Sequence, residues 1–573
     1  MALFTPSASP AIVVKEIDLT GVVPNVQSST GAIAGNFSWG PVEQPTLVSN
    51  EADLASKFGA PSTTNTTDFH NAAYFLRYSS DLYIIRGATA DANNASVLDS
   101  DSTLIKSRAD FENQQSALAA AGHTFIAKWP GEIGSSIAVE LCPYSLNDSA
   151  FDNWAYNTNF DAAPGTSQFA QAKGNNTARD EVHVVVLDAE GAFTGQRGAV
   201  LETYPFMSLG TNAKKSDGST NYILDVINTA SSYIWAAGVP DDLVQPAAIA
   251  ETGSFYNTEK DDISSQSMTG GTNSQILTED EYATAFATVD DVDTITIDFL
   301  IAPGLPTAQE QITVVNNLIT IAQSKRKDCV VVSSPNINAV VNNNNRVTDT
   351  VALANSLTSS SYLILDNNYL KVYDKYNDQY INIPAASSTA GIMAASDYNN
   401  APWFSPAGSR RGAYLGVTSV IYSPTKQERD TLYKAGINPV GNIPGQGLLL
   451  FGDKTHLLRP SAFDRINVRR LFLTIERAIA LAARNVMFEF NDEFTRAEFV
   501  NIVEPFLREI KGRRGITDFK VVCDETNNTA AVIDRNEFIA NIFIKPARSI
   551  NYITLNFVAV RTGVEFEEVV GTV

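Results

Sequence analysis

Residues 465–482, RINVRRLFLTIERAIALA, decide the fold of the C-terminal part of this chain. Apolar residues recur there at i, i+3, i+4, i+7, i+11 and i+14, which is the spacing of one face of an α-helix. A helix with such a face is stable when it buries that face, so we predict that it packs on a sheet. The face consists of Val468, Leu471, Phe472, Ile475, Ile479 and Ala482.

A second helix is predicted to follow, with Asn491 or Thr495 as its N-cap and Gly512 as its end. Pro505 lies inside it and predicts a kink. An alternating strand after residue 552 would complete a sheet-and-helix domain. The buried positions are Phe499, Ile502, Val503, Phe506 and Ile510 in the helix and Ile553, Leu555 and Phe557 in the strand.

Five arginines lie along the first predicted helix or just after it: Arg465, Arg469, Arg470, Arg477 and Arg484. The first four partly share a helical side next to the apolar face. A solvated helix surface and a contact surface both fit this pattern. The arginine fork suits bidentate ion pairs at interfaces, which keeps the second interpretation open.

Charge is distributed unevenly along the 573 residues, whose formal net charge is −22. Residues 91–290 contain 27 Asp and Glu against 9 Lys and Arg, whereas residues 457–573 contain 16 of each sign, with 13 Arg and 3 Lys. We therefore expect a solvated acidic body and a neutral, arginine-rich joining module. The net charge disfavours nucleic acid as a partner, because phosphate binding needs clustered basic residues.

The composition indicates a folded protein of three or four domains, with 44% hydrophobic and 18% charged residues. The three cysteines Cys142, Cys329 and Cys523 lie far apart, which argues against a disulfide framework and fits a reducing cytoplasm. We see neither a signal peptide nor an apolar run of membrane-spanning length, so direct membrane insertion is not expected.

The order of elements predicts a multidomain α+β and α/β protein. A βαβ-like unit runs from a strand at 295–302 through a helix with Ile312, Val315, Ile319 and Ala322 to a strand at 330–332. We predict five segments: an extended arm at 1–25, a discontinuous α/β middle domain at 26–90 plus 291–425, an acidic β-rich insertion at 91–290, a C-terminal domain at 426–561, and a second arm at 562–573. The insertion would form one or two domains, with strand-like runs at 182–187 and 222–227.

The two arms have the pattern of extended segments that add to another chain's sheet edge. Frayed termini are the ordinary alternative. We predict that residues 10–20 and 562–570 exchange between protomers. The apolar positions of these arms are Ile12, Val13, Val14, Ile17, Val564, Phe566 and Val569.

No catalytic constellation is visible. The phosphate-loop, zinc-peptidase, nucleophile-elbow and dinucleotide motifs are all missing, so no catalytic residue, cofactor site or metal site is assigned. The four histidines are dispersed, and a structural or surface role suits each of them: His70, His123, His183 and His456. The acidic cluster at 290–293 suits a solvated surface better than a calcium site, which needs six to eight converging oxygens.

Several short motifs resemble those of contractile phage tail sheath proteins, especially in the C-terminal region. The motifs are NVRR at 467–470, FEFND at 488–492, CDETNN at 523–528 and KPARSIN at 545–551, with fainter matches at 39–41, 58–59, 435–439 and 444–447. At Phe451 the family usually has Trp, a conservative change.

This resemblance implies a mechanical function without enzymatic activity. It implies six-subunit rings stacked helically around a tail tube protein, in a metastable extended state that contracts when the baseplate triggers it and drives the tube through the host envelope. It implies a tail terminator as a further partner, assembly in the host cytoplasm and a final place in the virion tail. The insertion would cover the exterior. Arg465, Arg469, Arg470 and Arg477 would then face the tube.

Three alternatives remain open at this point. The same residues suit the sheath of a bacterial contractile injection system or tailocin. A surface-acting hydrolase with an acidic site in residues 91–290 is supported only by acidic clusters. A surface-layer protein is disfavoured by the missing signal peptide.

Overall fold

The computed structural model describes residues 29–98, 103–145, 149–174, 176, 178–240, 243 and 262–551. Among these, residues 29–402 and 406–478 belong to one compact unit, here called the larger unit. Residues 403–405 and 479–551 belong to a second, called the smaller unit. Both predicted arms and the predicted strand at Ile553, Leu555 and Phe557 lie outside the described residues.

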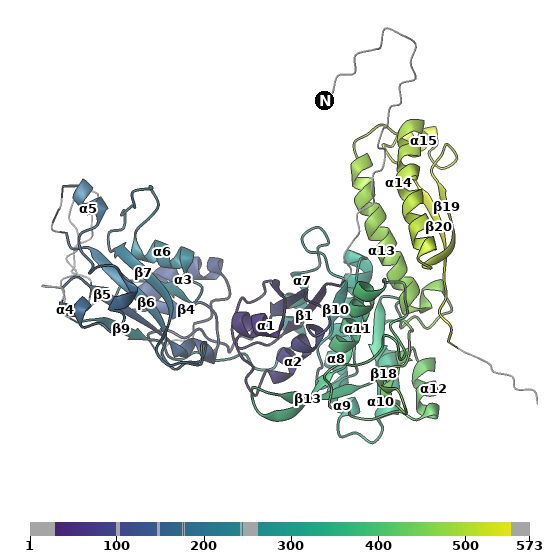
Figure 1. The fold of residues 1–573 in the computed structure, drawn as a ribbon, viewed down its shortest axis with the longest axis horizontal. Helices are drawn as coiled ribbons and strands as arrows, with labels where there is room; N and C mark the ends of the chain where they lie inside the picture. Colours follow the sequence, from purple (N-terminus) through teal and green to yellow (C-terminus); the bar gives the residue numbers. More distant parts are fainter. Residues whose placement is uncertain are drawn as a thin grey trace, which may run out of the picture. The chain divides into compact units, whose positions relative to one another are not determined.

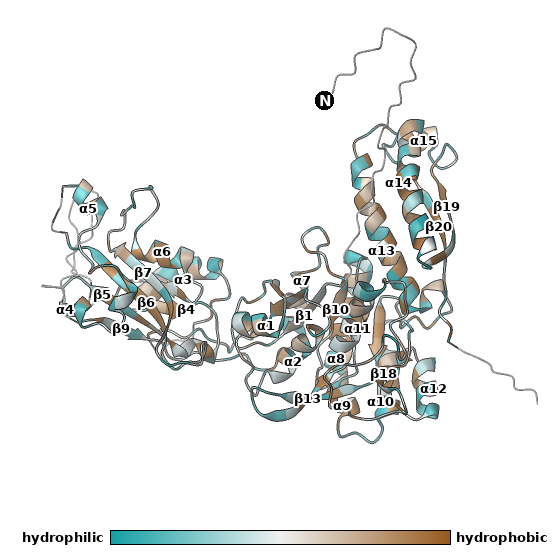
Figure 2. Cartoon of the chain, viewed as in Figure 1, coloured by the Kyte–Doolittle hydropathy of each residue, from teal (hydrophilic) through white to brown (hydrophobic). Residues whose placement is uncertain are grey.

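A seven-stranded sheet forms the centre of the larger unit, in the order β16-β12-β11-β10-β1-β3-β2 (Figure 1). All neighbours pair in parallel except β2, which is antiparallel to β3. The parallel strands are short apolar runs buried on both faces, as expected for a parallel sheet, whereas Leu47 of the edge strand β2 is 44% exposed (Figure 2). They are β1 (Gly31–Gly35), β2 (Thr46–Val48), β3 (Leu82–Arg86), β10 (Phe299–Ile301), β11 (Val330–Ser333), β12 (Leu363–Asp366) and β16 (Ile437–Asn438).

Helices cover both faces of this sheet and create two hydrophobic cores. Alternate strand residues point to opposite cores; for example, Ala32 contributes to one core and Ile33 to the other. The first core receives α7 (Glu279–Ala287), α8 (Ala308–Thr320), α10 (Arg346–Ser356) and α12 (Lys426–Lys434). The second receives α1 (Glu51–Phe58), α2 (Thr66–Phe75), α11 (Ala386–Asn399) and the start of α13 (Ile466–Ala483).

Two small sheets and a short helix complete this part of the larger unit. A three-stranded antiparallel sheet has the order β14-β13-β15, and β17 pairs with β18. Their inward faces share one apolar cluster around Leu370 and Leu450. The elements are β13 (Tyr369–Asp374), β14 (Gln379–Pro384), β15 (Ser419–Val420), β17 (Val440–Ile443), β18 (Gly447–Leu450) and α9 (Ile337–Val340).

The inserted segment is β-rich and leaves the α/β part through a paired stem. The N–H of Ser96 donates to the carbonyl of Thr269 at 2.9 Å, and the N–H of Thr269 donates back at 2.8 Å. A four-stranded antiparallel sheet, β7-β6-β5-β9, and the pair β4-β8 enclose its core. Its elements are β4 (Phe125–Ala127), β5 (Ile137–Pro143), β6 (Glu181–Asp188), β7 (Ala199–Ser208), β8 (Ile234–Ala236), β9 (Ser264–Ser267), α3 (Arg108–Ala120), α4 (Ser149–Asp152), α5 (Gln168–Ala172) and α6 (Ile223–Ala230).

The smaller unit is built from the second predicted helix and a two-stranded antiparallel sheet. α14 (Glu493–Gly512) buries Phe499, Val503 and Ile510, as the spacing predicts, together with Leu507. Its N-cap is Asp492, between the two predicted positions, and Pro505 lies inside it without ending it. The remaining elements are β19 (Ile516–Val522), β20 (Asn541–Pro546) and α15 (Ala530–Ile533).

Three predictions need correction. The run at 222–227 is not a strand but part of α6, because Ile223 and Ile227 are four residues apart and bury one helical face. The predicted insertion end at residue 290 is too late, since α7 packs in the α/β core. The predicted C-terminal domain start at residue 426 falls inside the larger unit, because β16 adds to the central sheet and α12 covers it.

Candidate assembly interface

Of the four arginines predicted to face a partner, Arg465 directly precedes α13 and the other three lie on it, where the larger unit holds them internally. Val468, Leu471 and Ile475 of the predicted apolar face are buried, as expected, and Phe472 is half-buried. The opposite side of the helix is also covered, because Ile466 and Leu473 belong to a core of the central sheet. The arginines between these apolar positions are therefore drawn into the protein.

Arg470 makes a two-pronged ion pair with Asp397 of α11. One guanidinium nitrogen, Nη1, donates to Asp397 Oδ1 at 2.7 Å, and Nη2 donates to Oδ2. The side chain of Arg470 is 5% exposed and that of Asp397 is 4% exposed. Breaking such a pair from one side leaves a buried charge without its counter-ion.

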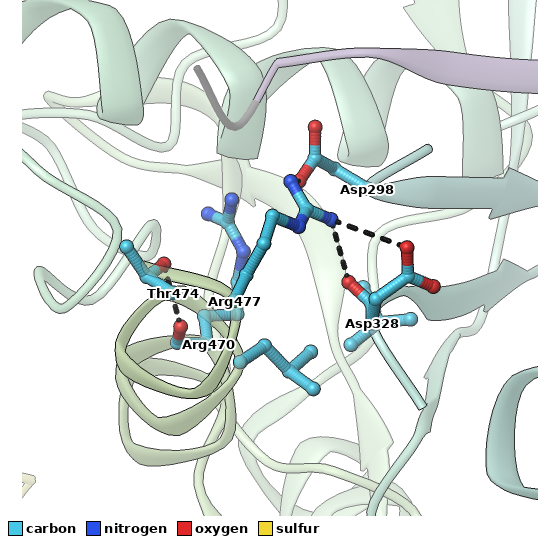
Figure 3. Close-up of a pocket in the computed structure, with 7 residues that line it drawn as sticks. Asp298, Asp328, Arg470, Thr474 and Arg477 are labelled. Atoms are coloured by element: carbon cyan, nitrogen blue, oxygen red, sulfur yellow. Dashed lines mark hydrogen bonds and ion pairs between the residues drawn. The ribbon is translucent and has the colours of Figure 1, made fainter. Parts of the chain in front are cut away.

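Arg477 reaches the amino ends of two neighbouring strands (Figure 3). Its Nη1 donates to Asp298 Oδ1 at 2.7 Å just before β10, and its Nη2 donates to the carbonyl of Asp328 at 2.8 Å just before β11. Burial alone would lower the pKa of Arg477, but the charges of Asp298 and Asp328 outweigh it and hold the pKa above its usual value. The guanidinium thus stays charged and fastens α13 to the sheet.

Arg469 and Arg465 are also engaged. The guanidinium of Arg469 lies between the rings of Tyr362 and Phe463, 4.4 and 4.2 Å from their centres. Burial lowers the pKa of Arg469. Arg465 donates to Asp453 Oδ1 at 2.9 Å. Each of these arginine side chains is thus bound within the larger unit. That this helix faces a tube stays a prediction.

A small pocket lies between α13 and the sheet, lined by Asp298, Asp328, Val330, Arg470, Leu473, Thr474 and Arg477 (Figure 3). It has room for about one water molecule. The ion pairs that line it are those described above, so it belongs to the helix anchor and not to a ligand site.

The carboxyl ends of the parallel strands are filled by the chain's own polar side chains. In open α/β sheets this is where ligands usually bind. Here Asp366 accepts hydrogen bonds from Ser334 Oγ at 2.8 Å and Thr389 Oγ1 at 3.1 Å. Burial raises the pKa of Asp366 to about 7. This polar cluster is a structural network.

Other predicted or rejected site residues can also be placed. All four histidines are buried, and both ring nitrogens of His183 bond to backbone groups of Ala162 and Phe206. Among the described residues, no group of three or more His, Cys, Asp or Glu side chains is placed to hold a metal ion. Of the helices in those residues, none is both long enough and apolar enough to span a bilayer.

The smaller unit has an open two-stranded sheet. Within the described residues β19 pairs only with β20, so each strand has an outer edge with no strand beside it. Along β20, exposed and half-buried residues alternate, and Phe543 is 60% exposed. Open edges of this kind are templates for pairing with another extended segment.

An aromatic loop at residues 488–494 leads into α14 in the same unit. The side chains of Phe488, Phe490 and Phe494 are largely exposed, although the loop backbone is well held. Asn491 Nδ2 donates to the carbonyl of Glu537 at 2.8 Å, and Arg496 Nη1 donates to Asn491 Oδ1 at 3.0 Å. Clustered exposed aromatics mark contact surfaces. The sequence motif FEFND drew attention to this loop, but periodicity alone did not reveal that its rings are exposed.

Comparison with known proteins identifies the family. Over 98% of this chain and 99% of its own length, the "Tail sheath protein" of Vibrio phage KVP40 is 31% identical. The chain belongs to the phage tail sheath protein family. The sheath protein of Salmonella phage ViI is 33% identical over 99% of this chain and 98% of its own length, and that of Enterobacteria phage T4 is 30% identical over 98% and 99%.

Three family models match successive parts of this sheath protein. The model described as "Tail sheath protein Gp18 domain III N-terminal region" matches residues 28–86. The "Phage tail sheath protein central domain" matches residues 277–456, and the "Phage tail sheath C-terminal domain" matches residues 459–559. The unmatched stretch between the first two contains the insertion.

Solved structures show the same fold at low sequence identity. The sheath tail protein of Listeria innocua is 12% identical, with a TM-score of 0.55 over 91% of this chain and 93% of that chain. The anti-feeding prophage helical sheath in its contracted state is also 12% identical, with a TM-score of 0.52 over 97% and 99%. The sheath protein described here is accordingly a structural component of a virion tail and not an enzyme.

Proposed function

We propose that this sheath protein polymerises with copies of itself into a helical sheath of stacked six-subunit rings around a tail tube. The sheath is assembled in the host cytoplasm in a metastable extended form, with baseplate and tail terminator proteins at its two ends. Contraction then drives the tube through the host envelope. Family membership supports this proposal, as does the absence of a nucleotide motif, which leaves assembly as the stage at which energy is stored.

The observation that carries the proposal is the open β19–β20 sheet of the smaller unit. It has two free edges among the described residues, and the sequence has two extended arms with alternating apolar residues. We propose that the arms at 10–20 and 562–570 of neighbouring subunits add to these edges. Main-chain hydrogen bonds would then link subunits while their α/β parts move as rigid bodies.

The other segments take complementary roles in this proposal. The insertion lies on the exterior of the sheath; its acidic composition and its place outside the matched family models support this. The aromatic loop at 488–494 adds an apolar contact surface to the smaller unit. The injection-system alternative is less favoured, because the relatives at 30% identity or more reported above come from phages.

The test is assembly of the purified full chain, followed by negative-stain microscopy and sedimentation. The wild type should form long, hollow, striated tubes. The double substitution Val564→Asp with Phe566→Asp should leave a soluble monomer, because it places charge on the face that pairs with a sheet. The matched control, Glu565→Gln with Glu567→Gln, changes the opposite face and should still assemble.

Deletion of residues 1–20 or 562–573 should likewise abolish tubes and leave a folded monomer. Long regular tubes from both truncated chains would contradict the arm exchange. A wild-type chain that stays monomeric under all assembly conditions, including in the presence of purified tail tubes, would contradict the proposed function itself.

A further inference from the structure

The basic side chains that are free to meet a partner do not lie on α13. Arg77 and four basic residues of segment 406–436 form no ion pair within 4.0 Å with any described residue. By contrast, Arg465, Arg470 and Arg477 each have a carboxylate partner inside the larger unit. The four residues of the segment are Arg410, Lys426, Arg429 and Lys434.

A loop at residues 408–412, which is hydrogen-bonded to β18, positions one of these cations. The N–H of Gly408 donates to the carbonyl of Leu450 at 2.9 Å, and the N–H of Leu450 donates to the carbonyl of Gly412 at 2.8 Å. These bonds hold Arg410, in the middle of the turn, beside the hairpin. The next residue after β18 is Phe451, and the guanidinium carbon of Arg429 lies 5.7 Å from the centre of its ring. Figure 1 shows α12 near β18.

Arg77, which lies just after the end of α2, contacts the same segment at Gly416. Its guanidinium lies directly over Gly416, where a larger side chain would collide with it. Tyr74 positions both groups, because its hydroxyl donates to the carbonyl of Gly416 at 2.8 Å and the guanidinium of Arg77 lies 4.2 Å from its ring centre. Arg77 is exposed despite these contacts.

Two exposed apolar side chains lie among these cations. Phe451 is 48% exposed and Leu415 is 51% exposed. Together they define what we call the basic face: Arg77, Arg410, Leu415, Arg429 and Phe451, flanked on α12 by Lys426 and Lys434. Arginine and aromatic side chains around an apolar centre are typical of the residues that carry binding energy at protein interfaces.

The local charge of this face opposes that of the whole chain. Segment 406–436 contains five Lys and Arg against two Asp and Glu, in a protein of net charge −22. Of the two acidic residues, Glu428 is used internally, since its carboxylate accepts from the N–H of Thr425 at 2.7 Å and from the Thr425 hydroxyl at 2.8 Å. The face thus presents nearly unopposed positive charge.

In an assembly of identical chains, the most acidic long stretch of sequence is the inserted segment. Ended before α7, where the structure places its boundary, it spans residues 91–278 and contains 23 Asp and Glu against 9 Lys and Arg. No ion pair joins the described part of the insertion to the basic face within one chain. We propose that the basic face binds the acidic insertion of a second copy of the chain.

This inference rests on the proposed self-assembly and adds a second contact to it, distinct from the arms. Complementary charge at such a contact would steer subunits into register and raise the rate of assembly. It would also make sheath formation depend on ionic strength, because partly exposed charge pairs are screened at a Debye length of about 8 Å in physiological salt.

The direct test is zero-length carbodiimide cross-linking of assembled full-length protein, which joins lysine amines only to carboxylates in contact. Lys426 and Lys434 are both exposed and supply the amines. A mixture of isotopically labelled and unlabelled chains distinguishes links between copies from links within one copy. We expect intermolecular links from Lys426 or Lys434 to carboxylates of the insertion.

Links from these lysines only to other segments, to a co-assembled tube protein, or within one chain would overturn the inference, as would no links in assembled tubes. Each of these outcomes leaves the tubes themselves intact. The proposed function is therefore judged separately, by whether the wild type assembles at all.

A pair of double variants tests how much the basic face contributes to assembly. Arg410→Glu with Arg429→Glu should raise the concentration needed for assembly by about tenfold at low salt, with the gap closing as salt rises. The control, Lys214→Glu with Lys215→Glu in the insertion, makes the same change in net charge but adds negative charge where the partner surface is already acidic, so it should assemble as well as the wild type. Equal assembly of both variants at every salt concentration would overturn the inference.

Discussion

At the scale of single residues, Arg465, Arg470 and Arg477 at and near α13 are internal anchors of the larger unit. The sequence revealed the arginines of the helix at 465–482 but not their partners, because these lie far away along the chain. Asp397 is 73 residues from Arg470, and Asp298 is 179 residues from Arg477. A lone sequence shows which charges exist, whereas pairing is decided by the fold. That is why the helix was predicted well and the internal partners of its arginines were not.

The Arg470–Asp397 pair leads to a prediction about stability. Asp397→Ala should lower the free energy of unfolding by about 3–5 kcal/mol, because it leaves a buried guanidinium without its counter-ion. Urea unfolding measures this. Glu112→Ala, which breaks the exposed Arg108–Glu112 pair, should cost less than about 1 kcal/mol. Equal effects of the two substitutions would show that the Arg470 pair is not an anchor.

Asp366 makes stability depend on pH. Its folded-state pKa of about 7 exceeds its ordinary value, so the folded chain keeps a proton that the unfolded chain releases above about pH 4. The stabilisation from this proton is complete below about pH 4 and is lost as the pH rises through 7. Asp366→Asn removes the titration.

Thermal unfolding of the wild type and Asp366→Asn should therefore be compared across pH. The melting temperature of the wild type relative to the variant should fall between about pH 4 and pH 8, corresponding to about 4 kcal/mol of stability. Asp430→Asn, at an exposed position of α12, serves as the control and should run parallel to the wild type. A constant difference between wild type and Asp366→Asn across this range would refute the assignment.

At the scale of elements, the parallel sheet was the most predictable part. The valines of β11 predicted a buried strand, and the spacing of Val315 and Ile319 predicted the buried face of α8. Ala322 continues that face in the π-helical turn at Ile321–Arg326. Errors occurred where local patterns were ambiguous. The run at 222–227 is apolar enough for a strand, and only its packing shows that it is α6. The stem and the exposed loop rings could not be foreseen, because they depend on contacts between distant segments.

One buried side chain ties three of these elements together. Gln311 of α8 donates from Nε2 to the carbonyl of Pro303 at 3.0 Å and to that of Ser334 at 3.2 Å, and its Oε1 accepts from the N–H of Leu305 at 2.9 Å. It is fully buried. It thus links the end of β10, the start of α8 and the end of β11.

Gln311→Leu should lower the free energy of unfolding by about 3 kcal/mol, because it leaves buried backbone groups without partners. The same substitution at the exposed neighbour Gln309 should have little effect. Hydrogen exchange at Leu305 would report the loss locally. Unchanged protection of that amide in Gln311→Leu would contradict the linking role.

At the scale of the whole molecule, each part serves the assembly differently. The larger unit anchors Arg470 and Arg477 and presents cations without ion pairs near β18, and in the described part of the smaller unit the β19–β20 sheet has open edges. The proposed arm exchange and the proposed docking of the insertion therefore use different surfaces. Substitutions at Val564 and Phe566 should abolish tubes at any salt concentration, whereas those at Arg410 and Arg429 should act mainly at low salt.

The paired stem at Ser96 and Thr269 is also a position at which the inserted domain could be replaced by another domain. Since two residues hydrogen-bonded across a strand pair lie about 5.5 Å apart, any compact domain whose own ends are neighbours could be spliced in there without stretching the α/β sheet. Such a splice removes Pro130 and with it the hydrogen bond that Arg86 Nη2 donates to the Pro130 carbonyl, so the new domain has to supply an acceptor there. A tube built from such chimeras would display a foreign cargo at every subunit, at a spacing set by the sheath lattice.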